Sequence, residues 1–151
     1  ALEAHALVCD SIEEALDGAE VVCTCTSSRD PIVRRGWLAP GAHVNAVGSS
    51  VPTSRELDAE LIAASALFVD RRESTVNESG DYLAAVEEAG IGPDHIRAEL
   101  GELLVESATG RRDETELTVF KSRGLAVEDL AAAALCTERA RERGVGTEVP
   151  F

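Results

Sequence analysis

The sequence predicts an α/β fold built on a doubly wound parallel sheet, and two observations favour this class. Short apolar segments rich in β-branched residues alternate with segments that carry helix start and stop signals. The apolar segments also end in turns of small residues, most clearly at residues 41–50 (GAHVNAVGSS). In such a sheet the carboxyl ends of the strands open onto a ligand crevice. We therefore expect the turn after residue 47 to lie beside a ligand.

In the first part of the chain, short strands alternate with one helix and several turns. Ser11 and Glu14 have the spacing of a capping box, which predicts a helix to about Asp17 with Gly18 as its stop. The segment 20–26 is β-branched and almost continuously apolar, which indicates a strand covered on both faces. Other strands are expected at residues 7–9 and 43–47, and a packed turn at 37–41.

The turn at residues 26–31 (TSSRDP) follows the predicted strand 20–26 and ends it with short polar residues. At the carboxyl edge of a doubly wound sheet, the hydroxyl and amide groups of such a turn can line a nucleotide. An ordinary polar turn capped by serine or aspartate has the same composition, so the residues alone leave both interpretations open.

A second capping box predicts the next helix. Thr53 and Glu56 have the required spacing, and the residues from Arg55 to about Ser65 carry apolar side chains at helical intervals. The short apolar segment 66–70 is predicted to be a buried strand that ends in a carboxylate. A repeated order of strand, turn and helix is typical of parallel sheets with right-handed crossovers.

Residues 71–81 are polar and are predicted to form a loop in which Glu78 and Asp81 flank a serine and a glycine. Carboxylates on such a loop could bind a substrate amine, hold an arginine, or simply be solvated. The expected elements beyond it are a helix at 82–88, a break at 89–93, a helix at 94–104 capped by Asp94, a charged loop at 106–114 and a strand at 115–122.

The last predicted element is a long helix from about Leu125 to Arg143. Its apolar residues share one face: Val127, Leu130, Ala131, Ala134 and Leu135. Arginines near its carboxyl end suit the helix dipole, and Gly144 is expected to end it.

Composition excludes several classes of function. The chain of 151 residues carries 14 basic and 28 acidic residues, a net charge of −14, which argues against nucleic acid or an anionic membrane as a general partner. A local pocket for a phosphate remains compatible with this charge. No apolar run approaches the roughly 18 residues that a membrane helix needs, and no signal peptide opens the chain. We therefore expect a cytoplasmic protein.

The cysteines do not predict a metal site. Cys23 and Cys25 are two residues apart in a predicted strand and point to one face, but no second pair of Cys or His at zinc spacing accompanies them. We expect them, with Cys9 and Cys136, to be buried reduced thiols.

A series of short motifs runs along the whole chain: GAEVV (18–22), TCTSS (24–28), WLAPGAHVNAVG (37–48), RELD (55–58), FVD (68–70), ESGD (78–81), AELGE (98–102), TVFKS (118–122) and GLAVED (124–129). In this order they resemble the ornithine cyclodeaminase/μ-crystallin family of NAD(P)-binding proteins. The resemblance implies a Rossmann-type domain, NAD or NADP as cofactor, and a small amino or imino acid as substrate. In full-length members a separate amino-terminal domain forms a homodimer and adds substrate contacts.

The resemblance also implies that the chain is an excerpt. Residues 1–122 correspond to the carboxy-terminal part of the NAD(P)-binding domain, and residues 123–151 to a helix that returns toward the amino-terminal domain. The chain contains no methionine and no G-x-G-x-x-G motif, and the first strands and the dimerisation domain are expected to be missing. In a sheet ordered 3-2-1-4-5-6 this leaves strand 20–26 as an open edge and strand 7–9 without a neighbour. Such a chain is expected to fold marginally or to dimerise through that edge, and to bind NAD(P) weakly.

Three turns are implied as cofactor contacts: Thr26, Ser27 and Ser28 on the adenosine and pyrophosphate side, Val47, Gly48 and Ser49 beside the nicotinamide ring, and Ser122. The resemblance also places Ser50 and Glu78 at the substrate site.

Ser50 decides between the branches of the family. It stands where ornithine cyclodeaminases carry an aspartate thought to act as acid and base, and a serine hydroxyl titrates too high for that role near neutral pH. The sequence therefore favours an NAD(P)H-dependent oxidoreductase acting on a cyclic ketimine or a small amino or imino acid. The alternatives are an ornithine cyclodeaminase, which converts ornithine to proline with release of ammonia, a non-catalytic protein that binds NADPH or a small ligand, and an inactive truncated remnant.

Overall fold

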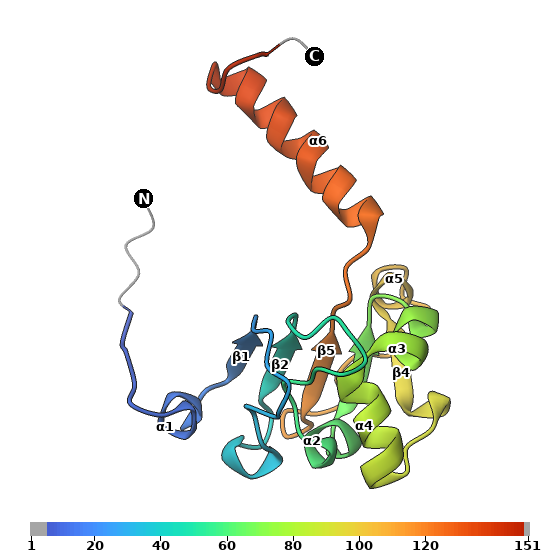
Figure 1. The fold of residues 1–151 in the computed structure, drawn as a ribbon. Helices are drawn as coiled ribbons and strands as arrows, with labels where there is room; N and C mark the ends of the chain where they lie inside the picture. The colour runs from blue at the N-terminus through green and yellow to red at the C-terminus, as the bar shows by residue number, and fades with distance from the viewer. Residues whose placement is uncertain (1–5, 150–151) are drawn as a thin grey trace.

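The computed structural model describes residues 6–149, and a five-stranded parallel sheet forms its centre. The strand order is β1-β2-β5-β3-β4 (Figure 1). The strands are β1 (Val21–Thr24), β2 (His43–Ala46), β3 (Ala66–Val69), β4 (Ile96–Glu99) and β5 (Thr118–Lys121). The last strand along the chain thus lies between β2 and β3, which confirms the predicted α/β class with parallel strands.

Helices connect the strands and cover the sheet. They are α1 (Ile12–Leu16), α2 (Ala59–Ala64), α3 (Arg72–Glu78), α4 (Gly80–Ala89), α5 (Leu100–Leu104) and α6 (Ala126–Arg143), with short 3-10 turns at Arg35–Trp37 and Pro93–His95. Helices α2 and α4 pack together against one face of the sheet, where Val44, Val69 and Val119 are fully buried. On the opposite face, Phe68 and Ala98 form a smaller apolar cluster.

The strand β1 lies at the edge of the sheet, which confirms the edge position expected for strand 20–26. It pairs with β2 alone, and its side chains alternate between exposed and buried. Val21 is 62% exposed and Cys23 is exposed too, whereas Val22 and Thr24 are buried. The expectation that residues 20–26 are covered on both faces is therefore wrong, because in the described structure nothing packs on the second face of this edge strand.

Several expected boundaries are also wrong. Residues 7–9 form no strand, and Leu7 is 91% exposed, because no neighbouring strand is present in the described structure to pair with them. The helix expected at 55–65 begins only at Ala59, with Asp58 as its cap accepting from the amide of Leu61 at 2.9 Å. Tertiary burial overrides the local capping signal here, since Glu56 is drawn into the core.

The polar segment 71–81 is helical rather than a loop, and it contributes α3 and the start of α4. The segment 94–104 does not form the single expected helix, but a 3-10 turn, the strand β4 and the short helix α5. Pairing with β3 outweighs the weak strand propensity of β4, which carries an arginine and a glutamate among its four residues.

The cysteine expectation also fails, because three of the thiols are exposed and Cys9 is intermediate in burial. Cys23 and Cys25 do share one face of β1 and its extension, but that face is open to solvent.

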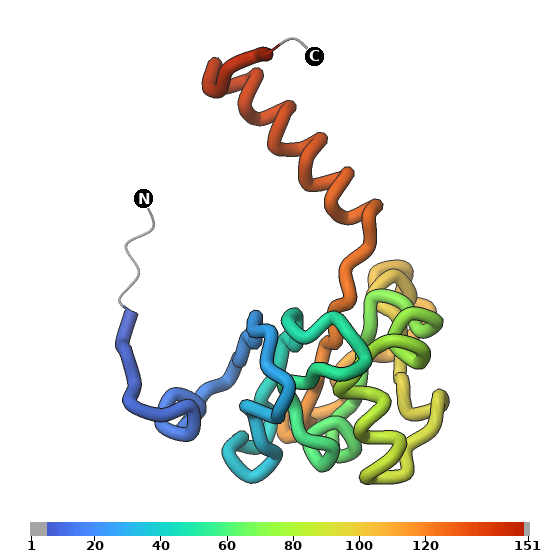
Figure 2. The backbone as a smooth tube through the Cα atoms, in the orientation of Figure 1, coloured from blue at the N-terminus to red at the C-terminus, as the bar shows by residue number. Residues whose placement is uncertain are grey.

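Other predictions are confirmed. Ser11 caps α1, with its hydroxyl accepting from the amide of Glu14 at 3.1 Å. The long helix α6 ends at Gly144, which has a left-handed φ of 61°. This helix has no buried residue and projects away from the sheet, joined to β5 by a single extended stretch of backbone (Figures 1 and 2). No helix in residues 6–149 has the length and apolar character required to cross a membrane.

Candidate functional site

The turns that follow β1, β2 and β5 meet at the carboxyl edge of the sheet, because these strands are parallel neighbours. The amides of Val47 and Gly48 donate to the carbonyl of Thr24 at 2.9 and 3.0 Å. The amide of Ser49 donates to the carbonyl of Thr26 at 2.9 Å. The first two turns are thus hydrogen-bonded to each other along their backbones.

The remaining residues implied as cofactor contacts lie at the same edge. The hydroxyl of Ser49 donates to the carbonyl of Ser28 at 2.9 Å, and the amide of Ser122 donates to the carbonyl of Ala46 at 3.0 Å. Ser27 lies exposed between its two neighbours. The structure therefore gathers every residue of the implied cofactor set at one edge: Thr26, Ser27, Ser28, Val47, Gly48, Ser49 and Ser122.

Gly48 stands at the closest approach of the two turns. A Cβ at this position would lie 2.2 Å from the carbonyl oxygen of Thr26 and 2.4 Å from its amide nitrogen. Two of the three nearest atoms are backbone, so a side chain could fit only if the turns moved apart. The next residue, Ser49, is 5% exposed and has a φ of 51°, a left-handed conformation that non-glycine residues seldom adopt. Such strained backbone persists where the surroundings hold it, and it is frequent at ligand sites.

Beneath these turns lies a buried ion pair. Lys121 ends β5 and points to the same face as Val119, and its side chain is 1% exposed. Its ammonium group lies 3.0 Å from Oδ2 of Asp81, whose side chain is fully buried, and donates to the carbonyl of Gly48 at 2.7 Å. Lys121 thus connects the turn after β2 to the first turn of α4.

A buried glutamate continues this network toward β1. Oδ1 of Asp81 accepts from the amides of Glu56 and Leu57, each at 2.8 Å. The carboxylate of Glu56 in turn accepts from the hydroxyl of Thr24 at 2.7 Å and from the amide of Thr26 at 2.6 Å. Both turns at the edge are therefore tied to the same set of buried charges.

The predicted substrate residues are brought together by an arginine. The guanidinium of Arg123 donates to the carboxylate of Glu78 and to the carbonyl oxygen of Ser50. Its backbone is fixed as well, because Oδ2 of Asp70 accepts from the amides of Arg123 and Gly124 at 2.6 and 2.7 Å. Of the roles left open for Glu78, holding an arginine is the one that the structure shows. The Glu78 side chain is 58% exposed, and Ser50 is exposed too.

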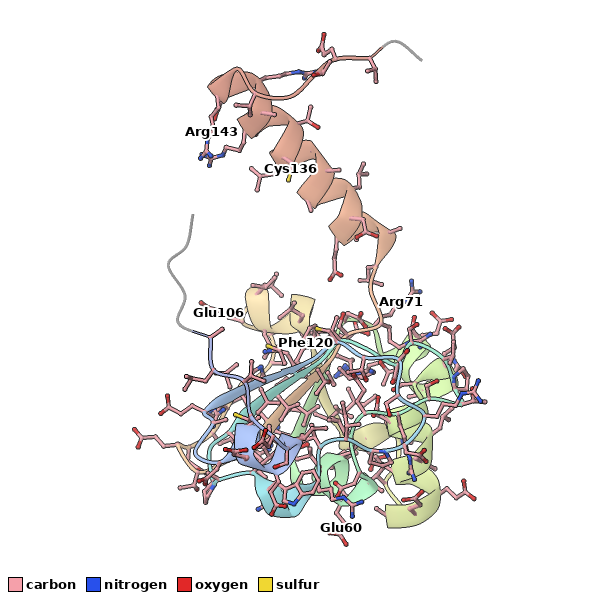
Figure 3. All side chains as sticks on the ribbon, turned by 60° about the vertical axis from the view of Figure 1, so that its left-hand side comes forward. Glu60, Arg71, Glu106, Phe120, Cys136 and Arg143 are labelled. Atoms are coloured by element: carbon pink, nitrogen blue, oxygen red, sulfur yellow. The ribbon has the colours of Figure 1, made fainter. Side chains whose placement is uncertain are left out.

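Figure 3 shows all side chains of the described residues on the ribbon, turned by 60° from the view of Figure 1. Arg71, which follows β3, lies toward the end of the fold from which the chain leaves for α6, whereas Glu60 of α2 lies at the opposite end. Cys136 and Arg143 lie out on α6, away from the three turns. The candidate site is therefore built by the sheet edge and not by the projecting helix.

Sequence reasoning missed three members of the network: Glu56, Asp81 and Lys121. The local pattern assigns Glu56 to a helix cap and Asp81 to a loop. Lys121 carries a usable signal, because it follows Val119 at a two-residue interval and so falls on the buried face of a central strand. A charged residue at such a position requires a buried partner.

A second ion pair lies at the opposite end of the sheet. Arg97 of β4 donates to both carboxylate oxygens of Glu116, at 2.6 and 2.8 Å, and Glu116 precedes the amino end of β5. These hydrogen bonds lower the pKa of Glu116 to about 2 and raise the pKa of Arg97. Within residues 6–149, no group of three or more His, Cys, Asp or Glu side chains is arranged to hold a metal ion.

Comparison with known proteins shows the family of this chain. The sequence model of the ornithine cyclodeaminase/mu-crystallin family matches residues 1–144. The chain belongs to this family. Ketimine reductase mu-crystallin of Mus musculus is 48% identical over 128 residues, which are 85% of this chain and 38% of that protein.

Solved structures of the family share the fold. The Δ1-pyrroline-2-carboxylate reductase of Thermococcus litoralis, solved with NADH and L-proline, is 42% identical with a TM-score of 0.85 over 93% of this chain and 44% of that one. An archaeal alanine dehydrogenase dimer with bound NAD is 34% identical with a TM-score of 0.80, over 94% of this chain and 44% of that one. The chain thus spans less than half the length of these relatives.

Proposed function

We propose that this chain forms the cofactor-binding half of an NAD(P)H-dependent oxidoreductase that reduces a cyclic ketimine or another small imino acid. The observation that carries the proposal is the meeting of three small-residue turns at the carboxyl edge of adjacent parallel strands, where doubly wound sheets bind ligands. Family members named as a ketimine reductase and a pyrroline-2-carboxylate reductase support this interpretation of the site.

The residues at the edge fit a dinucleotide. Exposed hydroxyl groups at Thr26 and Ser27 suit the ribose and pyrophosphate side, and Ser28 adds a third hydroxyl to this turn. On the other side, Val47 is 48% exposed and offers an apolar surface to a nicotinamide ring. Gly48, Ser49 and Ser122 complete the proposed contacts. When bound, the reduced nicotinamide supplies the hydride, and the protein supplies orientation.

The substrate side is proposed to include Ser50 and Glu78. The Ser50 hydroxyl is exposed beside the nicotinamide turn, so it can donate to the carboxylate of an imino acid. Glu78 is held by Arg123 and remains partly exposed, so its carboxylate has a fixed position from which to accept from an imino or amino group. No carboxylate at position 50 is present to act as acid and base, which disfavours the ornithine cyclodeaminase alternative.

The domain assignment extends the proposal. Residues 1–122 are the carboxy-terminal part of the NAD(P)-binding domain, and residues 123–151 reach toward a further domain of a homodimer in the full-length protein. The projection of α6 with Val127, Leu130 and Leu135 all more than half exposed supports this, because an apolar helix face of this kind is normally covered. The unpaired cysteines support a cytoplasmic location, where thiols remain reduced.

The test is a turnover assay on the natural full-length protein. NADH and NADPH are offered with Δ1-pyrroline-2-carboxylate, and oxidation of the dinucleotide is expected. Ornithine alone is expected to give no proline and no ammonia. Release of ammonia from ornithine would overturn the proposal in favour of the cyclodeaminase. Tight binding of NADPH without turnover of any cyclic imine would favour a binding protein.

A further inference from the structure

We propose that Lys121, Asp81 and Glu56 act as positioning residues that hold the two dinucleotide-binding turns at their working separation. None of the three is among the residues assigned to the cofactor or the substrate. The inference rests on the function proposed above, but its structural part concerns the turns themselves and can be tested without a ligand.

The geometry leaves the turn after β2 dependent on Lys121. The carbonyl oxygen of Gly48 accepts a hydrogen bond from the Lys121 ammonium group at 2.7 Å. Gly48 is also the residue where the two turns approach most closely. The adjacent Ser49 is held in a left-handed conformation, which an unsupported turn would tend to relax. Lys121 thus fixes a strained segment from below, out of contact with solvent.

Glu56 does the same for the turn after β1. Its two carboxylate oxygens accept hydrogen bonds from the hydroxyl of Thr24 and from the amide of Thr26. Thr26 begins the proposed pyrophosphate turn. Asp81 joins the two supports, because one of its oxygens faces Lys121 and the other accepts from the amide of Glu56. A displacement of one turn is therefore transmitted to the other through buried, charge-assisted contacts.

Burial explains why the arrangement is stiff. Lys121, Asp81 and Glu56 are each exposed by 1% or less, so water cannot replace a lost partner. Removal of Lys121 or Asp81 alone would leave the other charge of their ion pair unpaired in the interior, which is strongly destabilising. The paired substitution Lys121→Met with Asp81→Asn removes both charges of this ion pair and leaves Glu56 with its hydrogen bonds from Thr24 and Thr26. The side-chain carbonyl oxygen of the introduced asparagine can still accept from the amides of Glu56 and Leu57.

The first measurement is amide hydrogen exchange of the natural full-length protein without ligand. In the double variant Lys121→Met/Asp81→Asn, the amides of residues 47–49 are expected to exchange at least tenfold faster than in the wild type. The matched control is Arg97→Met/Glu116→Gln, which removes an ion pair at the other end of the sheet. In the control these amides are expected to change by less than twofold.

The second measurement is dinucleotide binding and steady-state kinetics. The KM and Kd for NADH are expected to rise at least tenfold in the double variant, with kcat at saturating NADH within threefold of wild type. This split indicates lost ground-state binding and not lost chemistry. A purely structural role would lower the melting temperature and leave the Kd unchanged, as expected for the control.

A gentler pair of variants covers the case in which the double variant does not fold. Thr24→Val removes the hydroxyl that donates to Glu56, and Thr24→Ser keeps it. Exchange at the amide of Thr26 is expected to rise about fivefold in Thr24→Val and to return to the wild-type rate in Thr24→Ser. Equal rates in these two variants would overturn the role of Glu56.

The outcomes separate the two proposals. A wild-type protein that binds neither NADH nor NADPH refutes the proposed function, while exchange at residues 47–49 still decides whether the buried charges position the turns. A folded double variant with wild-type exchange and wild-type Kd overturns the inference. Faster exchange with an unchanged Kd overturns it as well, because the turns would then not need this support to bind the dinucleotide.

Discussion

Replacement of Gly48 by alanine is expected to push apart the two turns that form the candidate site. The added Cβ would lie 2.2 Å from the carbonyl oxygen of Thr26, 2.4 Å from the amide nitrogen of the same residue and 2.4 Å from Oε1 of Glu56. Carbon and oxygen atoms without a bond between them require about 3.3 Å, so the turns must separate by roughly 1 Å. Backbone on one side and a buried carboxylate on the other leave no flexible group to yield.

The magnitude follows from what the separation would break. Overpacking of this kind costs about 1–3 kcal/mol by itself. The amides of Val47 and Gly48 share the carbonyl of Thr24, and the amide of Ser49 uses that of Thr26. Weakening these bonds adds about 1 kcal/mol for each one lost. We therefore expect Gly48→Ala to lower the free energy of unfolding by about 3 kcal/mol.

Denaturant unfolding of the natural full-length protein measures this loss, with Gly101→Ala as the matched control. Gly101 lies in α5, has no heavy atom within 4 Å of an added Cβ, and its φ is not positive. Alanine is favoured over glycine in helices, so the control is expected to be neutral or slightly stabilised. If Gly48→Ala unfolds at the same denaturant concentration as Gly101→Ala, the two turns have room for a Cβ at residue 48 and the reasoning is refuted.

Three further predictions address other parts of the fold. The ion pair of Glu116 with Arg97 depresses the Glu116 pKa from 4.5 to about 2, so its contribution to stability is complete above pH 4.5 and is lost as the pH falls toward 2. After allowance for solvent screening, the ion pair contributes about 1–2 kcal/mol to the free energy of unfolding. Glu116→Gln should therefore flatten the pH dependence of the free energy of unfolding between pH 4.5 and 2. Ser50→Ala should lower kcat/KM for the imino acid about tenfold, which corresponds to about 1.4 kcal/mol of transition-state stabilisation, and should leave the Kd for NADH unchanged. Ser50→Thr keeps the hydroxyl group, so an equal loss in that variant would contradict the proposed hydrogen bond. The isolated chain 1–151 should self-associate on a sizing column through its open edge strand, and Val21→Lys should reduce the association; no change on substitution would place the contact elsewhere.

The sequence predicted best where local pattern and tertiary structure agree. The strands at 43–46, 66–69 and 118–121 lie in short segments bounded by turn residues, and their apolar side chains Val44, Leu67 and Val119 are buried in the sheet as the pattern predicts. The long helix α6 has its own stop signal at Gly144, which needs no tertiary partner to act. Such features lie within a few residues of one another and can be found from one sequence.

The wrong predictions share a physical cause, because contacts between residues far apart in the sequence determine the local structure at these positions. Glu56 carries the signature of a helix cap, but its partners Thr24 and Thr26 are 32 and 30 residues away. The strand β4 contains two charged residues, and Arg97 finds its partner 19 residues later in Glu116. Neither partner is visible in a local window. The family motifs did locate the candidate edge, because they mark the turns themselves.

The position of β5 explains why the candidate site depends on so distant a residue as Lys121. Although β5 is the last strand, it pairs with β2 and β3 at once, placing Lys121 opposite Ala46 and Val69. A shift of β5 by one residue would turn Lys121 to the other face, away from Asp81, and would leave that carboxylate buried without a cation. The ion pair therefore favours one register of the central strand. Because that register also sets Lys121 beneath Gly48 and Ser122 beside Ala46, the same pairing that completes the sheet brings the turns of the proposed cofactor site together.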